Sequence, residues 1–272
     1  MLKKIKKNKI AFISFLTIIL IILLAVFVPV ITPYSYFEQE LSMANSPPSF
    51  SHIFGTDNLG RDLFTRVLYG ARISLAIGFF AAFLNLIVGV LYGGISGYFG
   101  GNIDNVMMRI VDIFYSIPLI LYVVLLMVVL KPGLVNIFIA LSIVYWLRMA
   151  RIVRNQVMSL KNKEYVLAAK MLKASHFRII TKHILPNCFG PILVTATLAI
   201  PEAIFTEAFL SFVGLGVTAP MASWGVLAVD GLNSLRSYPY QLLFPSLFIC
   251  ITMFSFNFLS DYLRDVFDPK MK

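Results

Sequence analysis

Hydrophobic positions in this 272-residue chain gather in long blocks instead of alternating with polar positions. An α-helix needs about 20 apolar residues to cross a bilayer, and six blocks approach or exceed that length. They cover residues 10–31, 73–95, 113–130, 134–147, 188–213 and 242–259. We therefore predict an all-α, polytopic membrane protein with six transmembrane helices.

Composition agrees with this class, because 59% of the residues are hydrophobic and only 13% are charged, against about 25% charged in soluble proteins. The first block follows five lysines, as a secretory signal would. Its apolar run is too long for a signal peptide, and no small-residue cleavage site follows it. We expect it to be retained as a helix.

Lysine and arginine are distributed unevenly between the loops. With the N-terminus in the cytoplasm, 18 of the 23 fall in cytoplasmic segments and 5 outside. The positive-inside rule then predicts that both termini are cytoplasmic. The net charge of +10 requires no nucleic acid, because basic cytoplasmic loops lie against anionic lipid head groups.

The longest polar stretch between hydrophobic blocks is "EYVLAAKMLKASHFRIITKHILPN", residues 164–187. We predict two short helices here, separated at Lys173, with Ser175 capping the second and Pro186 ending it before the fifth block. Helical spacing gives the first helix one face of small and apolar residues: Tyr165, Ala168, Ala169 and Leu172. Such a face permits close approach of another protein; the alternative is a loop lying on lipid head groups.

The same stretch resembles the E-A-A-x3-G-x9-I-x-L-P loop of ABC importer permeases, which docks in a groove of the ATPase. Ala168, Ala169, Leu185 and Pro186 match that motif, whereas Leu167 replaces its glutamate and Lys173 its glycine. His183 holds the isoleucine position, as in the peptide branch. The resemblance implies that the coupling residues are Glu164, Ala168, Ala169, Leu172, Lys173, Leu185 and Pro186.

Lys173 leaves two conformations open, because the family glycine permits a tight turn between the two helices. Lysine must either adopt a left-handed conformation, which costs about 1–2 kcal/mol, or lengthen the first helix by part of a turn. We expect the longer helix.

Four further stretches look like the C-type permease of oligopeptide, dipeptide and nickel importers. They are "GTDNLGRDLFTRVLYGARISLAIG" (55–78), "GGNIDNVMMRIVDIFYSIP" (100–118), "EAFLSFVGLGVTAPMASWG" (207–225) and "LRDVFDPK" (263–270). The resemblance implies the ABC type I importer permease fold. It also implies three regions: a first helix with an extracytoplasmic segment (1–70), a permease domain (71–262) with its coupling loop at 148–187, and a short cytoplasmic tail (263–272).

The partners implied by this resemblance are a second, homologous permease subunit, two ATPase subunits and an extracytoplasmic substrate-binding protein. The location it implies is the bacterial cytoplasmic membrane. ATP would be used by the partner subunits, and no cofactor would be bound by this chain.

Acidic residues inside or beside the hydrophobic blocks are candidates for the translocation path. Asp112 precedes the third block, and Glu202 and Glu207 lie in the fifth. Intramembrane acids are costly and usually face a bundle interior or a water-filled path. For Glu207 we favour pairing with a polar group inside the bundle.

Residues 57–68 have helical spacing of apolar positions, with Asp62 and Arg66 four residues apart. We predict an amphipathic helix at the outer membrane surface with an ion pair between these two side chains.

The sequence contains no phosphate-binding loop, because none of its glycines is followed by lysine. Its three histidines, His52, His176 and His183, are too scattered to suggest a metal site, and no catalytic set converges. We therefore expect no enzyme activity in this chain itself and predict a permease subunit of an ATP-driven peptide importer. The alternatives are a nickel or metal-chelate importer permease and a stand-alone secondary transporter, which would not need a docking hairpin.

Overall fold

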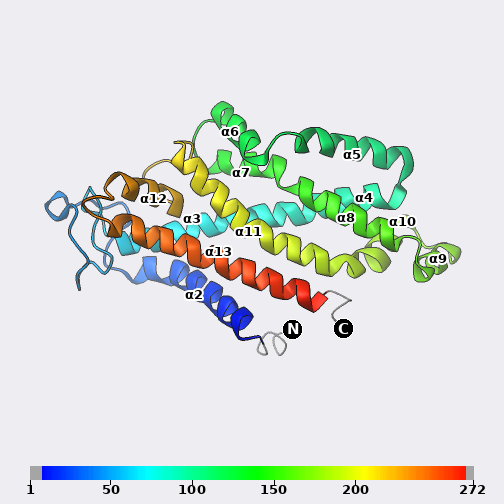
Figure 1. The fold of residues 1–272 in the computed structure, drawn as a ribbon, viewed down its shortest axis with the longest axis horizontal. Coiled ribbons are helices and arrows are strands. Elements are labelled where there is room, and N and C mark those ends of the chain that lie inside the picture. Colours follow the sequence, from blue (N-terminus) through cyan, green and yellow to red (C-terminus); the bar gives the residue numbers. More distant parts are fainter. Residues whose placement is uncertain (1–7, 268–272) are drawn as a thin grey trace.

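The computed structural model describes residues 8–267, so four of the N-terminal lysines and the end of the predicted tail lie outside the described part. Within that part the chain is helical, apart from turns, loops and one isolated β-bridge. The long helices run side by side in an elongated bundle (Figure 1). The predicted all-α class is confirmed.

Five helical runs are long and apolar enough to cross a membrane. They are α2 (Lys9–Ile31); α3 (Leu63–Leu84) continued by a π-helical turn (Asn85–Gly89) and α4 (Val90–Phe99); α7 (Leu134–Val144) with α8 (Trp146–Leu160); α10 (His176–Arg178) continued into α11 (Phe189–Phe212); and α13 (Tyr240–Phe267). Helices α5 (Gly101–Tyr115) and α6 (Leu119–Leu130) meet at 78° and make a sixth span if they are counted together.

The bounds of four of the six blocks, the second, third, fourth and sixth, differ from the sequence-based prediction. The third block is not one straight helix, because the chain bends between Tyr115 and Leu119, where Pro118 cannot donate a backbone hydrogen bond. The fourth block extends to Leu160 and the sixth to Phe267, since helices continue into polar segments beyond their apolar parts. Helix α3 already begins at Leu63, so the predicted region boundary at residue 70 falls inside a helix.

The core of the bundle lies between α3, α11, α13 and the short helix α12 (Trp224–Asn233). Trp224 is fully buried there, and its indole N–H donates to the carbonyl of Val67 at 2.9 Å. Helix α2 packs on the outside of this group, where the guanidinium of Arg72 donates to the carbonyls of Ala25 and Val26 at 2.6 and 2.7 Å. The first hydrophobic block is therefore an integral part of the bundle.

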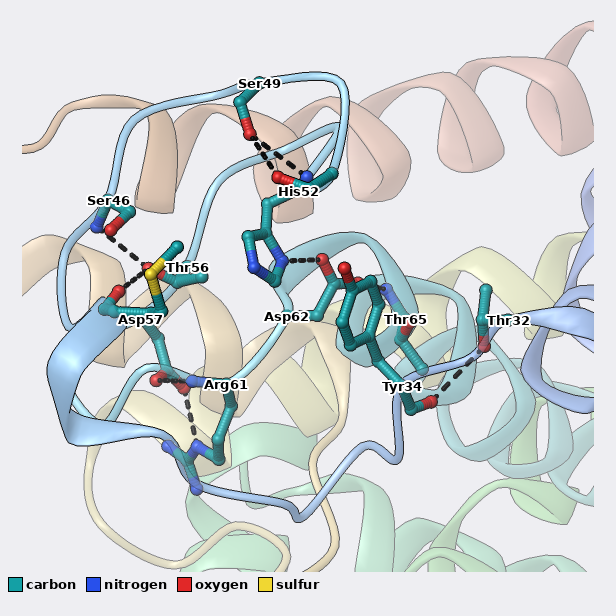
Figure 2. Close-up of polar contacts among 12 residues, drawn as sticks. Thr32, Tyr34, Ser46, Ser49, His52, Thr56, Asp57, Arg61, Asp62 and Thr65 are labelled. Carbon is teal, nitrogen blue, oxygen red and sulfur yellow. Dashed lines mark hydrogen bonds and ion pairs between the residues drawn. The ribbon is translucent and has the colours of Figure 1, made fainter.

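Residues 32–62 form a cap over one end of the bundle, held by buried polar contacts (Figure 2). Asp62 caps α3 by accepting from the backbone N–H of Thr65 at 2.8 Å, and it also contacts the imidazole of His52 at 2.9 Å. Arg66 instead pairs with Asp57. The predicted Asp62–Arg66 pair is wrong, because a capping carboxylate turns toward its own helix N-terminus.

The predicted surface helix over residues 57–68 is also wrong. Residues 57–62 form a turn, and Leu63 is the first residue of a membrane-spanning run. Leu63, Val67 and Leu68 are buried in the bundle. Their helical spacing reflects packing against protein instead of lipid.

Helix α4 and the π-helical turn before it pack closely on α8 through a stripe of three glycines, Gly89, Gly93 and Gly97. A Cβ atom added to Gly93 would lie 2.3 Å from the carbonyl oxygen of Ala150. Small residues spaced by four let two membrane helices approach at backbone distance. The stripe therefore fixes α8, the helix that leads to the polar stretch, against α4.

Candidate functional site

The polar stretch forms a helical hairpin at the end of the bundle opposite the cap (Figure 1). Its first helix is α9 (Glu164–Met171), and α10 begins at His176. Ser175 caps α10 by accepting from the backbone N–H of Arg178 at 3.3 Å. The predicted helix–turn–helix and its cap are confirmed. We call residues 164–187 the hairpin.

Lys173 adopts a left-handed backbone conformation with φ of 55°. Helix α9 ends at Met171, so the expected longer helix is wrong. The N–H of Lys173 donates to the carbonyl of Lys170 at 2.9 Å, and that of Ala174 to the carbonyl of Ala169 at 3.1 Å. These two bonds form a Schellman motif, which satisfies the terminal carbonyls of the helix and offsets the strain at Lys173.

Replacing Lys173 with glycine should therefore stabilise the hairpin, by about 1 kcal/mol, because glycine adopts this conformation without a Cβ clash. The matched control is Lys170→Gly, inside α9, which should cost about 1 kcal/mol. Thermal unfolding of the purified variants in detergent measures both. A lower midpoint for Lys173→Gly than for the parent chain would contradict the left-handed assignment.

The two sides of α9 have different environments. Val166 and Ala169 are buried, with 0% and 6% of their surface exposed, in a cluster that includes Ile179, Ile184 and residues of α4 and α8. This differs from the expectation that Ala169 belongs to the docking face. Ala168 is exposed. Spacing alone placed Ala169 beside Ala168, but Val166 and Ala169, three residues apart, share the inner side.

The opposite side of the hairpin is apolar and exposed. Met171 and Leu172 have 86% and 84% of their surface exposed, and Phe177 has 76%. Leu167 and Tyr165 are also exposed. We call Leu167, Ala168, Met171, Leu172 and Phe177 the tip face. Large apolar side chains gathered on a projecting tip are typical of a protein or membrane contact.

The hairpin joins the membrane bundle without a flexible loop. From His176 the chain passes through a π-helical turn (Ile179–Ile184) and a 3₁₀ turn (Leu185–Cys188) directly into α11. Pro186 does not end the second helix as predicted, because it occupies the first turn of the 3₁₀ segment, where no N–H is needed. The hairpin and α11 are thus joined by continuous helical turns.

Two side-chain contacts, one from Lys161 just before the hairpin and one from His176 within it, reach the end of α4. The ammonium of Lys161 donates to the carbonyl of Gly97 at 3.0 Å, and the hydroxyl of Tyr98 lies 2.8 Å from Nδ1 of His176. The segments that precede and follow α9 are therefore fixed to the same helix terminus. The hairpin and α4 should move together.

The three acidic residues predicted for the translocation path lie in three different environments. Glu207 is fully buried and accepts hydrogen bonds from Ser211 at 2.8 Å and Ser223 at 2.5 Å, with Ser74 at 3.5 Å. It links α3, α11 and the segment before α12. The interpretation of Glu207 as an internal polar partner is confirmed.

Glu202 faces a cavity of about 580 Å³. Its carboxylate accepts from the guanidinium of Arg148 at 2.6 Å, and both side chains are about half exposed. Asp112 pairs with Arg151 at 2.6 Å and lines a separate hollow with Arg154. Glu202 and Asp112 are thus not brought together.

Ion pairs also fix α5 on its neighbours. Asp104 accepts from Arg154 of α8 at 2.5 and 2.7 Å and from Ser96 of α4 at 2.5 Å. Ser96 is eight residues from Asp104, whereas Arg154 is 50 residues away. Only tertiary packing therefore reveals the pairing with Arg154.

Sequence reasoning also missed Arg148 and Asn85, which line the same cavity as Glu202. Arg148 directly follows the fourth apolar block in the sequence, and that position predicts a cytoplasmic charge. The glycine stripe was missed as well, although its spacing of four was visible in the sequence.

The sequence matches two models of known protein families. Residues 89–272 match the model of the binding-protein-dependent transport system inner membrane component, and residues 1–48 match the N-terminal transmembrane domain of oligopeptide transport permease C. The first match covers more than half of the chain. The chain belongs to this family of inner membrane permease components.

Individual relatives agree with that assignment. The chain is 55% identical to the oligopeptide transport system permease protein OppC of Bacillus subtilis over 99% of this chain and 88% of that protein. It is 51% identical to the dipeptide transport system permease protein DppC of the same organism, over 99% and 85%. OppC of Escherichia coli is 44% identical over 98% and 89%.

Among solved structures, inward-facing MetNI methionine ABC transporter matches with a TM-score of 0.60. That match covers 74% of this chain and 96% of the other, at 18% sequence identity. It supports the permease fold alone.

Proposed function

We propose that this chain is the C-type permease subunit of an ATP-driven importer of oligopeptides or dipeptides. The observation that carries the proposal is the combination of a family permease bundle with an exposed apolar tip on a rigid hairpin. Relatives named as peptide permeases favour peptides over nickel or metal chelates.

The complete importer would contain a second, homologous permease, two ATPases and a binding protein outside the membrane. Both termini and the hairpin would face the cytoplasm, in line with the charge distribution, and the cap would face the binding protein. ATP would be bound and hydrolysed by the partner subunits, and this chain would bind no cofactor.

Coupling would begin at the tip face, which inserts into a groove of one ATPase. Ala168 and Leu172 would contact the groove, while Glu164 and Lys173 would lie at its rim. Ala169 would support the tip from behind, and Leu185 and Pro186 would connect it to α11. ATP-driven closure of the ATPases would shift the hairpin as a rigid body and tilt α11, opening the path to one side of the membrane.

Glu202 remains a candidate for the path, because it faces a cavity. Glu207 would hold the bundle together from inside, and Asp112 would position α5 against α8. A stand-alone secondary transporter has no use for an exposed tip face, so that alternative is not favoured.

Reconstitution of the importer in proteoliposomes tests this function. With ATP inside and binding protein outside, the complex should import a labelled tripeptide or dipeptide, and omission of this chain should abolish import. ATP-dependent import of Ni²⁺ without any peptide import would contradict the proposed substrate. Peptide import by this chain without ATPases would contradict the coupling.

A further inference from the structure

The cavity beside Glu202 is built from separate elements of the bundle. Asn85 comes from the π-helical turn after α3, Arg148 from α8, and Glu202 and Thr206 from α11. Phe114 and Phe205 form apolar walls. Its volume of about 580 Å³ falls within the range of about 300–1,000 Å³ seen for small-ligand pockets.

The charged pair in this cavity lies within the membrane-spanning part of the bundle. Arg148 is 14 residues beyond the first residue of α7, and Glu202 is 10 residues before the last residue of α11. These separations correspond to roughly 21 and 15 Å along a helix. Half-exposed charges at such positions face a water-filled path or another subunit, because exposure to lipid is too costly.

Asn85 provides a second, independent sign of a binding site. Only 2% of its surface is exposed, it lines the cavity, and its Oδ1 has no hydrogen-bond partner among the described residues. Buried polar atoms are nearly always paired. Its backbone begins a π-helical turn, a distortion that often occurs at functional sites.

We infer that this cavity is a substrate subsite in which Glu202 and Arg148 bind the terminal ammonium and carboxylate of a zwitterionic peptide, and Asn85 accepts a hydrogen bond from a peptide N–H. The inference rests on the proposed function. The resting pair is half exposed, so both charges are accessible, and such pairs are weak enough to exchange partners.

The charge balance of the site selects the class of ligand. One guanidinium beside one carboxylate is neutral overall and complements a molecule that carries one charge of each sign. A bare divalent cation would meet the repulsion of Arg148 at the carboxylate. The unpaired acceptor of Asn85 matches the N–H groups that every peptide supplies along its backbone.

The test measures selectivity for peptide termini in proteoliposomes that contain the complete importer. Uptake of trialanine, N-acetyl-trialanine and trialaninamide is compared, each at a binding-protein concentration that saturates its rate. The parent importer should transport trialanine at least fivefold faster than either blocked peptide. This comparison needs no substitution, so it cannot be confounded by misfolding.

Two variants assign the termini. Glu202→Gln should reduce the preference for trialanine over N-acetyl-trialanine to less than twofold. It should leave the preference for trialanine over trialaninamide unchanged. Arg148→Gln should reduce the preference for trialanine over trialaninamide to less than twofold and leave the preference over N-acetyl-trialanine unchanged. Asp112→Asn, which breaks a similar ion pair outside the cavity, should leave both ratios unchanged. ATP hydrolysis stimulated by the binding protein verifies assembly.

The outcomes separate the subsite from the proposed function. If the parent importer shows no preference for free termini, or if both cavity variants keep its ratios, the subsite is overturned while peptide import stands. A general fall in the uptake of all three peptides with unchanged ratios also overturns it, because that is the effect of a purely structural role. If the parent importer takes up none of the peptides, the proposed function itself fails.

Discussion

Leu172→Asp should abolish copurification of the ATPase and peptide uptake together. Leu172 is 84% exposed at the centre of the tip face, so the substitution leaves the fold of this chain intact. In a docked complex it would bury an unpaired carboxylate, at a cost of about 3 kcal/mol or more. That corresponds to roughly a hundredfold loss of affinity. Affinity capture of the ATPase by the tagged permease measures the first effect, and proteoliposome uptake the second.

Asn162→Asp is the matched control. Asn162 is exposed in the turn before α9 and is not part of the tip face. The substitution therefore adds the same negative charge near the hairpin without changing the contact between the tip face and the ATPase. Capture and uptake should both remain within about twofold of the parent level. Equal loss from both variants would mean that charge near the hairpin, and not burial at the tip, is responsible. Ala169→Asp is a poorer test, because Ala169 is buried within this chain.

Gly93→Ala should destabilise the bundle where α4 meets α8. The added Cβ would lie 2.3 Å from the carbonyl oxygen of Ala150 and 3.0 Å from its carbonyl carbon, and these backbone atoms cannot rotate away. Overpacking of this kind typically costs about 1–3 kcal/mol, which lowers the unfolding midpoint by about 2–4 °C per kcal/mol. Uptake should fall as well, because α8 leads directly to the hairpin.

The neighbouring residue gives a control that differs by one position. A Cβ added to Gly94 would have its nearest neighbours, in Ile180 and Leu185, at 3.9 Å, which is ordinary van der Waals contact. Gly94→Ala should be neutral or stabilising, since alanine favours helix over glycine by about 1 kcal/mol. Thermal unfolding in detergent measures the midpoints of both variants, and the midpoint of Gly93→Ala should be the lower one. Equal midpoints would show that α4 and α8 do not pack at backbone distance.

Local sequence signals predicted much of this architecture. Apolar blocks identified the spanning segments, and Ser175 was recognisable as a helix cap from its position alone. Helix ends were less accurate, because α8 and α13 continue through polar residues beyond their apolar parts. The bend at Pro118 was not predicted, although a proline inside an apolar block is a local signal for a break in a helix.

Features that depend on tertiary packing could not be predicted from local sequence patterns. Ala169 and Ala168 are chemically alike, and only the position of α4 and α8 decides that one is buried and the other exposed. Lys173 was expected to prolong its helix, but Schellman hydrogen bonds hold it in the left-handed region. The cavity pair joins Arg148 to Glu202, 54 residues apart, so no local pattern could have predicted it.

Photo-crosslinking from the tip face tests the central claim most directly. A benzoylphenylalanine placed at Leu172 should crosslink to the ATPase in the intact importer, because the tip lies in the ATPase groove. The same probe at Phe50, which is fully exposed within the cap of residues 32–62, should not reach the ATPase. An importer that takes up peptide with the probe at position 172 but crosslinks to the ATPase only from position 50 would contradict the account.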